Sequence, residues 1–303
     1  MAPRQRKIME NIIICLVTCI WFGINAYVLY GFCYNVLWHH VRPYHQKPAI
    51  AILVLVCWLN LHAMISFIAI HWYGPGKINA DYSRPVESQL DQAFLCDQDG
   101  YQLYCSYCKR VKPNRTHHSV HTDSCVPVMD HFCPWVGTVI GQGNYKFFLQ
   151  YLCSAAFALI IVIVTLLVFQ HMPLPEINGN SIALYIVAGG CLLFITVLFI
   201  QHCVYVLLSQ TTLEHMNYRR SPGPYFNILW RPGQRRVVQA SPREIMIPHA
   251  SPYTQGYWSN ITTVMGPVYT WLLPIRSPIH EPIVGEQFLK KMRAQLDEIE
   301  KNL

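Results

Sequence analysis

Four long apolar segments without a single Asp, Glu, Lys or Arg constrain this chain more than any other feature of its sequence. They cover residues 12–29, 49–73, 147–169 and 181–208. A helix needs about 20 consecutive apolar residues to cross the hydrocarbon core of a bilayer, and each segment comes close to or exceeds that length. Backbone polar groups inside a bilayer have to be satisfied within the spanning structure. The sequence therefore predicts an α-helical, multi-pass membrane protein with four transmembrane helices.

The distribution of basic residues predicts how these spans are oriented. Arg4, Arg6 and Lys7 precede the first span, seven basic residues lie between the second and third spans, and eleven follow the fourth. The loop after the first span holds only Arg42 and Lys47, and the loop after the third holds none. By the positive-inside rule, we expect both termini and the loop between spans 2 and 3 in the cytosol. This pattern fits the plasma membrane and the endomembranes (ER or Golgi) equally.

The net charge of +7 is then an excess on the cytosolic face. Such an excess suits an anionic inner leaflet, or the phosphates of a cofactor. No basic stripe with interleaved aromatic residues runs along the sequence, so we do not expect nucleic acid as a partner.

These features divide the sequence into four regions. Residues 1–73 hold an N-terminal tail with spans 1 and 2, and residues 74–146 a cytosolic loop with a cysteine-rich core at 96–146. Residues 147–208 hold spans 3 and 4, and residues 209–303 form a cytosolic C-terminal region. We expect residues 77–95 to be irregular, and residues 221–256, with six prolines, to be extended and partly flexible. Residues 260–274 are apolar and aromatic but too short to span. Residues 286–303 show the apolar spacing of a helix.

Three cysteines and a histidine in the central loop have the number and chemistry of zinc ligands: Cys105, Cys108, His118 and Cys125. Spaced cysteines in the reducing cytosol indicate metal ligands or nucleophiles rather than disulfides. His117 and His121 are alternative donors. A site closed by four protein ligands leaves no position for water, so we expect structural zinc. The loop is too short for an apolar core of its own and should depend on that metal to fold.

Cys133 follows Asp130 and His131 at the spacing of a possible nucleophilic triad. Attack on a thioester needs a thiolate, whereas a free cysteine titrates near pH 8.5. His131 could take the proton as general base, with Asp130 fixing its tautomer and orientation. The residues alone leave an alternative open, in which Asp130 and His131 bind or pack and Cys133 is an unreactive buried thiol.

Residues 105–148 resemble the cysteine-rich domain of the DHHC-type protein S-acyltransferases, or palmitoyltransferases. The resemblance rests on the Cys-x2-Cys pair, Lys-Pro at 112–113, Arg-Thr-His-His at 115–118, Asp-His-x-Cys-Pro-Trp-Val at 130–136 and Gly-x2-Asn-Tyr-Lys-Phe-Phe at 141–148. Outside this region, Thr-Thr-x-Glu at 211–214 is similar to the family's TTxE motif, and residues 260–274 to its C-terminal motif. Gly-Pro-Gly at 74–76 stands where the family has Asp-Pro-Gly.

The resemblance implies a two-step reaction. Palmitoyl-CoA acylates Cys133 and releases CoA, and a cysteine of a substrate protein then takes the acyl group. The acyl chain is expected in a cavity among the spans, and Thr211, Thr212 and Glu214 are expected to brace the active-site loop. Arg110, Lys112 and Arg115 are candidates for binding the CoA phosphates. The expected partners are the bilayer, acyl-CoA and proteins with an acceptor cysteine.

One departure from the family pattern concerns metal. Members usually hold two zinc ions, and the first ligand set falls on the four residues named above. The second set falls on Ser119, Thr122, Phe132 and Val139, none of which is a usual zinc ligand. We therefore expect one structural zinc, with Phe132 and Val139 packed in place of the second ion. The resulting Asp-His-Phe-Cys sequence resembles a fungal subgroup of the family. The loss also leaves an alternative of another class: a catalytically silent membrane adaptor whose zinc module binds partner proteins.

Overall fold

The computed structural model describes residues 3–78, 93–169, 179–220, 223–241, 251–277 and 282–302. The chain divides into two compact units. The first, which we call the helical unit, comprises Met1–Trp72, Cys133–Thr138 and Phe147–His202. The second, the cysteine-rich unit, comprises Tyr73–Phe132, Val139–Lys146 and Cys203–Leu303.

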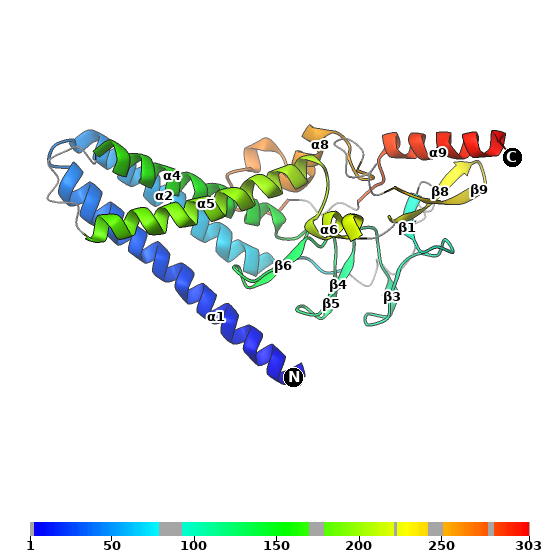
Figure 1. Ribbon diagram of the computed structural model, residues 1–303, viewed down its shortest axis with the longest axis horizontal. Coiled ribbons are helices and arrows are strands. Elements are labelled where there is room, and N and C mark those ends of the chain that lie inside the picture. Colours follow the sequence, from blue (N-terminus) through cyan, green and yellow to red (C-terminus); the bar gives the residue numbers. More distant parts are fainter. Residues whose placement is uncertain are drawn as a thin grey trace. The chain divides into compact units, whose positions relative to one another are not determined.

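Long helices account for most of the helical unit (Figure 1): α1 (Pro3–Val28) with its continuation η1 (Leu29–Val41), α2 (Gln46–Tyr73), α4 (Tyr145–Phe169) and α5 (Gly179–Leu207). Within the described residues, four segments are long and apolar enough to cross a membrane, which confirms the predicted fold class: Ile14–Val41, Gln46–Tyr73, Tyr145–Phe169 and Ile182–Leu207. The first extends well beyond the predicted residue 29. The helix continues as the π-helical η1 because no proline interrupts the sequence before Pro43.

The core of the helical unit lies where η1, α2, α4 and α5 meet. Phe32, Val56, Val162 and Leu184 are fully buried there. The opposite helix faces expose large apolar side chains, as helices that face lipid do.

Three short antiparallel hairpins follow one another in the described part of the central loop. β2 (Tyr104–Cys105) pairs with β3 (Arg110–Val111), β4 (His117–Ser119) with β5 (Ser124–Val126), and β6 (His131–Cys133) with β7 (Thr138–Ile140). Strands this short bury little apolar surface, so the hairpins need another source of stability. Their sequences carry the candidate metal ligands and the Asp-His-Phe-Cys run.

A three-stranded antiparallel sheet joins distant parts of the sequence: β1 (Ala93–Cys96), β8 (Tyr225–Arg231) and β9 (Gln234–Gln239), in the order β1-β8-β9. Helix α9 (Glu286–Lys301) adds Phe288, Leu289 and Met292 to the core beneath the sheet. This helix confirms the helical structure predicted from the apolar spacing in residues 286–303.

The sheet contradicts two sequence-based expectations. Residues 93–95 are not irregular and residues 225–239 are not merely extended, because they pair with each other, with Leu95 opposite Phe226. The prediction of a flexible segment was wrong because it rested on the number of prolines and not on their positions. Pro224 precedes β8 and Pro232 lies in the turn between β8 and β9, where neither interrupts a strand. Residues 79–92 and 242–250 lie outside the described part of the chain.

The Gly-Pro-Gly run at 74–76 packs closely on the loop before α4. Gly143 donates its N–H to the carbonyl of Pro75 at 3.0 Å. A Cβ atom at Gly143 would lie 2.6 Å from the carbonyl oxygen of Gly74, so only glycine permits this approach.

Helices α6 (Thr212–Arg220) and α8 (Tyr257–Met265) and the 3-10 turn η3 (Val268–Thr270) complete the cysteine-rich unit.

Candidate active site and metal centre

Strand β6 determines the directions of His131, Phe132 and Cys133. Successive side chains of a strand point to opposite faces, so His131 and Cys133 share one face and Phe132 occupies the other. The imidazole and the thiol, two residues apart, therefore face the same side of the strand.

The Asp130 carboxylate is buried and accepts three hydrogen bonds. His131 donates from Nδ1 at 2.6 Å, and Thr212 donates from its backbone N–H and its hydroxyl, both at 2.8 Å. The backbone N–H of Asp130 bonds to the carbonyl of Ile140 at 2.9 Å, which fixes the position of the residue. A proton on Nδ1 leaves Nε2 as the basic nitrogen of His131, as general-base catalysis requires.

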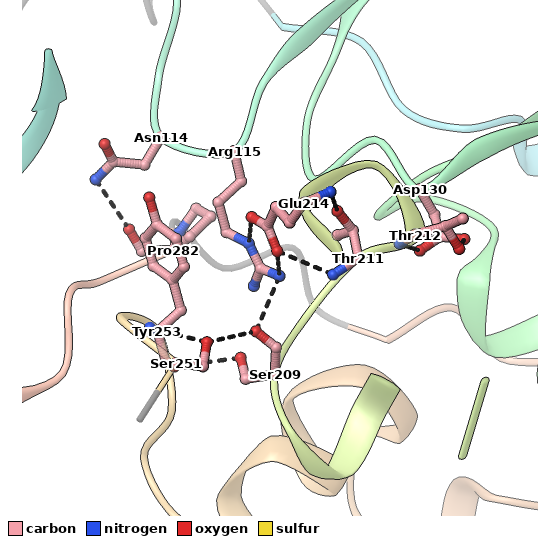
Figure 2. Close-up of polar contacts among 10 residues, drawn as sticks. All are labelled: Asn114, Arg115, Asp130, Ser209, Thr211, Thr212, Glu214, Ser251, Tyr253 and Pro282. Carbon is pink, nitrogen blue, oxygen red and sulfur yellow. Dashed lines mark hydrogen bonds and ion pairs between the residues drawn. The ribbon is translucent and has the colours of Figure 1, made fainter. Parts of the chain in front are cut away.

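Thr212 is held by a reciprocal cap at the start of α6 (Figure 2). The Thr211 hydroxyl accepts the backbone N–H of Glu214 at 3.1 Å, and the Glu214 carboxylate accepts the backbone N–H of Thr211 at 2.9 Å. This is the capping box of a Thr-x-x-Glu sequence. It fixes the first turn of α6, and with it the two donors that reach Asp130.

A buried ion pair extends this arrangement to the turn before β4. Arg115 forms two parallel hydrogen bonds of 2.7 Å to Glu214, and both side chains are 9% exposed. Its Nη2 also donates to the carbonyl of Ser209 at 3.1 Å, and its guanidinium lies 4.7 Å from the centre of the Tyr253 ring (Figure 2). Sequence reasoning missed this pair, although the capping-box spacing at Thr211 and Glu214 was a usable signal.

Arg115 was one of three candidates for CoA phosphates. Because its guanidinium is buried in the ion pair with Glu214, Arg115 has a structural role and is not accessible to CoA phosphates. Arg110 donates to the carbonyls of Ile78 and Cys108, at 3.1 and 3.4 Å, and is partly exposed, as is Lys112. The structure thus leaves these two as the accessible cations of the three.

The predicted metal ligands come together in the hairpins. The Sγ atoms of Cys105, Cys108 and Cys125 and a ring nitrogen of His118 all lie within 4.8 Å of one another. His118 Nδ1 is 3.3 Å from the sulfur of Cys108 and 3.6 Å from that of Cys105. Tetrahedral zinc, with bonds of about 2.3 Å to sulfur and 2.0 Å to nitrogen, would place ligand atoms about 3.5–3.8 Å apart. The donor set therefore fits a zinc ion.

Two positions of the second ligand set, Phe132 and Val139, belong to an apolar cluster. Val139 is fully buried with Val126 and Met129, and Phe132 packs against them. The other face of Phe132 is occupied by His121, whose ring stacks on it at a centroid distance of 3.7 Å. Within the described residues these positions form no metal-binding group. The expected packing of Phe132 and Val139 is present, and His121 takes part in it.

An apolar cavity of about 350 Å³ lies within the helical unit, and Cys133 is part of its lining. Trp21, Ala63, Tyr151 and Leu159 lie around it, and Trp21 donates a hydrogen bond to the Tyr151 hydroxyl. The loop after Cys133 is held by α2. The two ring nitrogens of His71 contact the carbonyls of Val136 and Phe67, each at 2.9 Å. The cavity has the size of a small-molecule site and lining suited to a hydrocarbon chain.

Comparison with known proteins agrees with this geometry. The family description "DHHC palmitoyltransferase" matches residues 98–219. The chain is 32% identical to Palmitoyltransferase PFA5 of Kluyveromyces lactis, over 83% of this chain and 78% of that protein. It is 30% identical to Palmitoyltransferase PFA5 of Eremothecium gossypii, over 89% and 81%. The protein of the same name in Saccharomyces cerevisiae is 26% identical, over 63% and 60%. These relatives are fungal, as the Asp-His-Phe-Cys sequence led us to expect, and the chain belongs to the DHHC palmitoyltransferase family.

Proposed function

We propose that this chain is a protein S-acyltransferase that moves palmitate from palmitoyl-CoA to cysteine thiols of substrate proteins through a thioester on Cys133. The observation that carries the proposal is the position of Cys133, which lines an apolar cavity among the spans and follows His131 on one face of β6. The names of the relatives support the activity. No comparison favours the silent-adaptor alternative.

In the first step, His131 Nε2 accepts the thiol proton of Cys133 and the thiolate attacks the thioester carbonyl. The bond from the carbonyl carbon to the CoA sulfur breaks, and the proton on His131 passes to the departing CoA thiolate. Asp130 stabilises the imidazolium that forms between these transfers, because its carboxylate already accepts the Nδ1 proton. A positioned general base contributes typically about 10²–10⁴-fold to the rate.

In the second step, His131 takes the proton of an acceptor cysteine, whose thiolate attacks the acyl carbonyl on Cys133. The thioester to Cys133 breaks, and its thiolate recovers the proton from His131. The enzyme returns to its starting state, so one active site serves both half-reactions.

The cavity would hold the hydrocarbon chain of the donor. Burial of apolar groups is favourable by about 0.8 kcal/mol per methylene. A long acyl chain would thus bind far more tightly than a short one. Arg110 and Lys112 are proposed to meet the CoA phosphates, as charge-assisted partners outside the cavity.

We assign the metal a structural role. Cys105, Cys108, His118 and Cys125 would hold one zinc ion, which would join the β2–β3 and β4–β5 hairpins and leave no coordination site for water. We also propose that both termini and the active site face the cytosol, where the basic loops lie.

The experiment is acyl labelling of the detergent-purified protein with radiolabelled palmitoyl-CoA. Wild type should carry label that hydroxylamine releases, and Cys133→Ser should carry none. Cys19→Ser is the matched control, because Cys19 lies on an exposed part of α1 and does not line the cavity. It should label like wild type. Equal hydroxylamine-sensitive label on Cys133→Ser and wild type would contradict the proposal and revive the adaptor alternative.

A further inference from the structure

One segment of the cysteine-rich unit has the composition of a membrane interface. Residues 251–275 contain no Asp, Glu, Lys, Arg or His. Within this segment, seven large apolar or aromatic side chains are at least 43% exposed: Tyr257, Trp258, Val268, Tyr269, Leu272, Leu273 and Ile275. Exposed apolar side chains are ordinary when scattered, but a concentration of them marks a surface that contacts something apolar.

Four polar side chains of this segment donate hydrogen bonds to carbonyls within it. The hydroxyls of Thr262 and Thr263 donate to carbonyls of their own helix, at 3.1 and 2.8 Å. The Thr270 hydroxyl donates to the carbonyl of Pro267 at 2.7 Å, and the Trp271 indole N–H to that of Gly266 at 2.9 Å. Threonine hydroxyls also make such bonds in soluble helices. Against lipid these bonds are required, because lipid offers no hydrogen-bond partners.

Two buried side chains attach the segment to the ends of spanning helices. Lys146, in the first turn of α4, donates to the Thr270 hydroxyl at 3.1 Å and to the Ile275 carbonyl at 2.9 Å. Asn260 donates from Nδ2 to the carbonyl of Leu207, the last residue of α5, at 2.8 Å. The spans Tyr145–Phe169 and Ile182–Leu207 begin and end at these points. The segment is therefore held at the level where the chain passes between bilayer and water.

We propose that α8, η3 and residues 271–275 lie in the plane of the bilayer interface and bury Trp258, Tyr269 and Leu272 among the lipids. Tryptophan and tyrosine prefer this zone because each combines an apolar ring with a polar group. The segment is too short to span, and its lack of charge separates it from the basic helices that bind anionic headgroups. Its partner is thus the neutral headgroup and upper acyl region. This contact lies outside the acyl-transfer site and fixes the C-terminal region to the membrane surface.

Photo-cross-linking in phosphatidylcholine nanodiscs tests this contact. A benzophenone amino acid replaces Tyr269 or Leu272 in the full-length protein. The control positions are Tyr104 and Tyr107, aromatic residues of the cysteine-rich hairpins that are 58% and 78% exposed. After irradiation, mass spectrometry counts lipid adducts at each position, and autoacylation verifies that each variant is folded.

Lipid adducts at 269 and 272 should exceed those at 104 and 107 several-fold. Equal adduct yields at all four positions would overturn the proposal. Cross-links from 269 or 272 predominantly to a second copy of the chain would also overturn it, by assigning the surface to an oligomer. Because the readout compares positions within active protein, an unfolded variant cannot produce the expected result.

Discussion

Replacing Arg115 by methionine should unfold the cysteine-rich unit at a markedly lower temperature. The substitution keeps an apolar side chain of similar length and leaves the Glu214 carboxylate buried at 9% exposure without its cation. Breaking a buried ion pair on one side costs about 3–5 kcal/mol, because an unpaired charge remains in a desolvated site. For a unit of this size, each kcal/mol shifts the midpoint by about 2–4 °C, which gives a loss of about 6–20 °C.

Two further variants separate the charge effect from lost packing. Arg115→Met combined with Glu214→Gln removes both charges and keeps an oxygen that can accept the N–H of Thr211, so most of the loss should be recovered. Arg231 forms an ion pair with Glu300, with side chains 47% and 49% exposed. Arg231→Met should therefore cost only about 0–1 kcal/mol.

The assay is the thermal midpoint of detergent-purified protein, taken as loss of the monodisperse chromatographic peak after a fixed heating step. An Arg115→Met midpoint within about 1–2 °C of wild type, which is at most about 1 kcal/mol by the same scaling, would refute the reasoning. A double variant as unstable as the single one would place the damage in lost packing against Tyr253.

Elemental analysis should find one zinc per chain. Cys108→Ala should lose this zinc and the fold of the hairpins, whereas Ser119→Ala should keep both. Two zinc ions per chain would show that another set of residues completes the second site. His131→Ala should lower the initial rate of autoacylation by about 10²–10⁴-fold in a folded protein, and an unchanged rate would exclude His131 as the base. Cys96 should resist iodoacetamide at neutral pH, because burial and, to a lesser extent, the charge of Asp97 raise the pKa of its thiol to about 12. Rapid modification of Cys96 in folded protein would show that strand β1 opens readily.

The sequence was sufficient wherever the signal was local. Uninterrupted apolar runs predicted the four spans, and the Cys-x2-Cys spacing predicted the metal cluster, because both depend on neighbours within a few dozen residues. The packing of Phe132 and Val139 was also predicted from residue types, since neither side chain is a zinc ligand.

The features that escaped prediction depend on partners far away in the sequence. Leu95 pairs with Phe226, and neither the polar residues before β1 nor the prolines around β8 indicate that pairing. Arg115 was a candidate for binding the CoA phosphates, but its guanidinium is paired with Glu214, 99 positions further on. Residue types alone do not distinguish a buried arginine from an exposed one when its partner is so remote.

The hydrogen bonds from Thr212 to Asp130 have a consequence for the order in which the enzyme is made. The two residues are 82 positions apart, with α4 and α5 between them. At about 5–20 residues per second, a ribosome needs about 4–16 s to synthesise that interval. Throughout this time Cys133 and His131 exist in a nascent chain whose Asp130 lacks its two donors from α6. Assembly of the proposed catalytic group therefore has to await synthesis of α6, so a chain that stalls before α6 emerges leaves Cys133 without the braced histidine that is proposed to activate it.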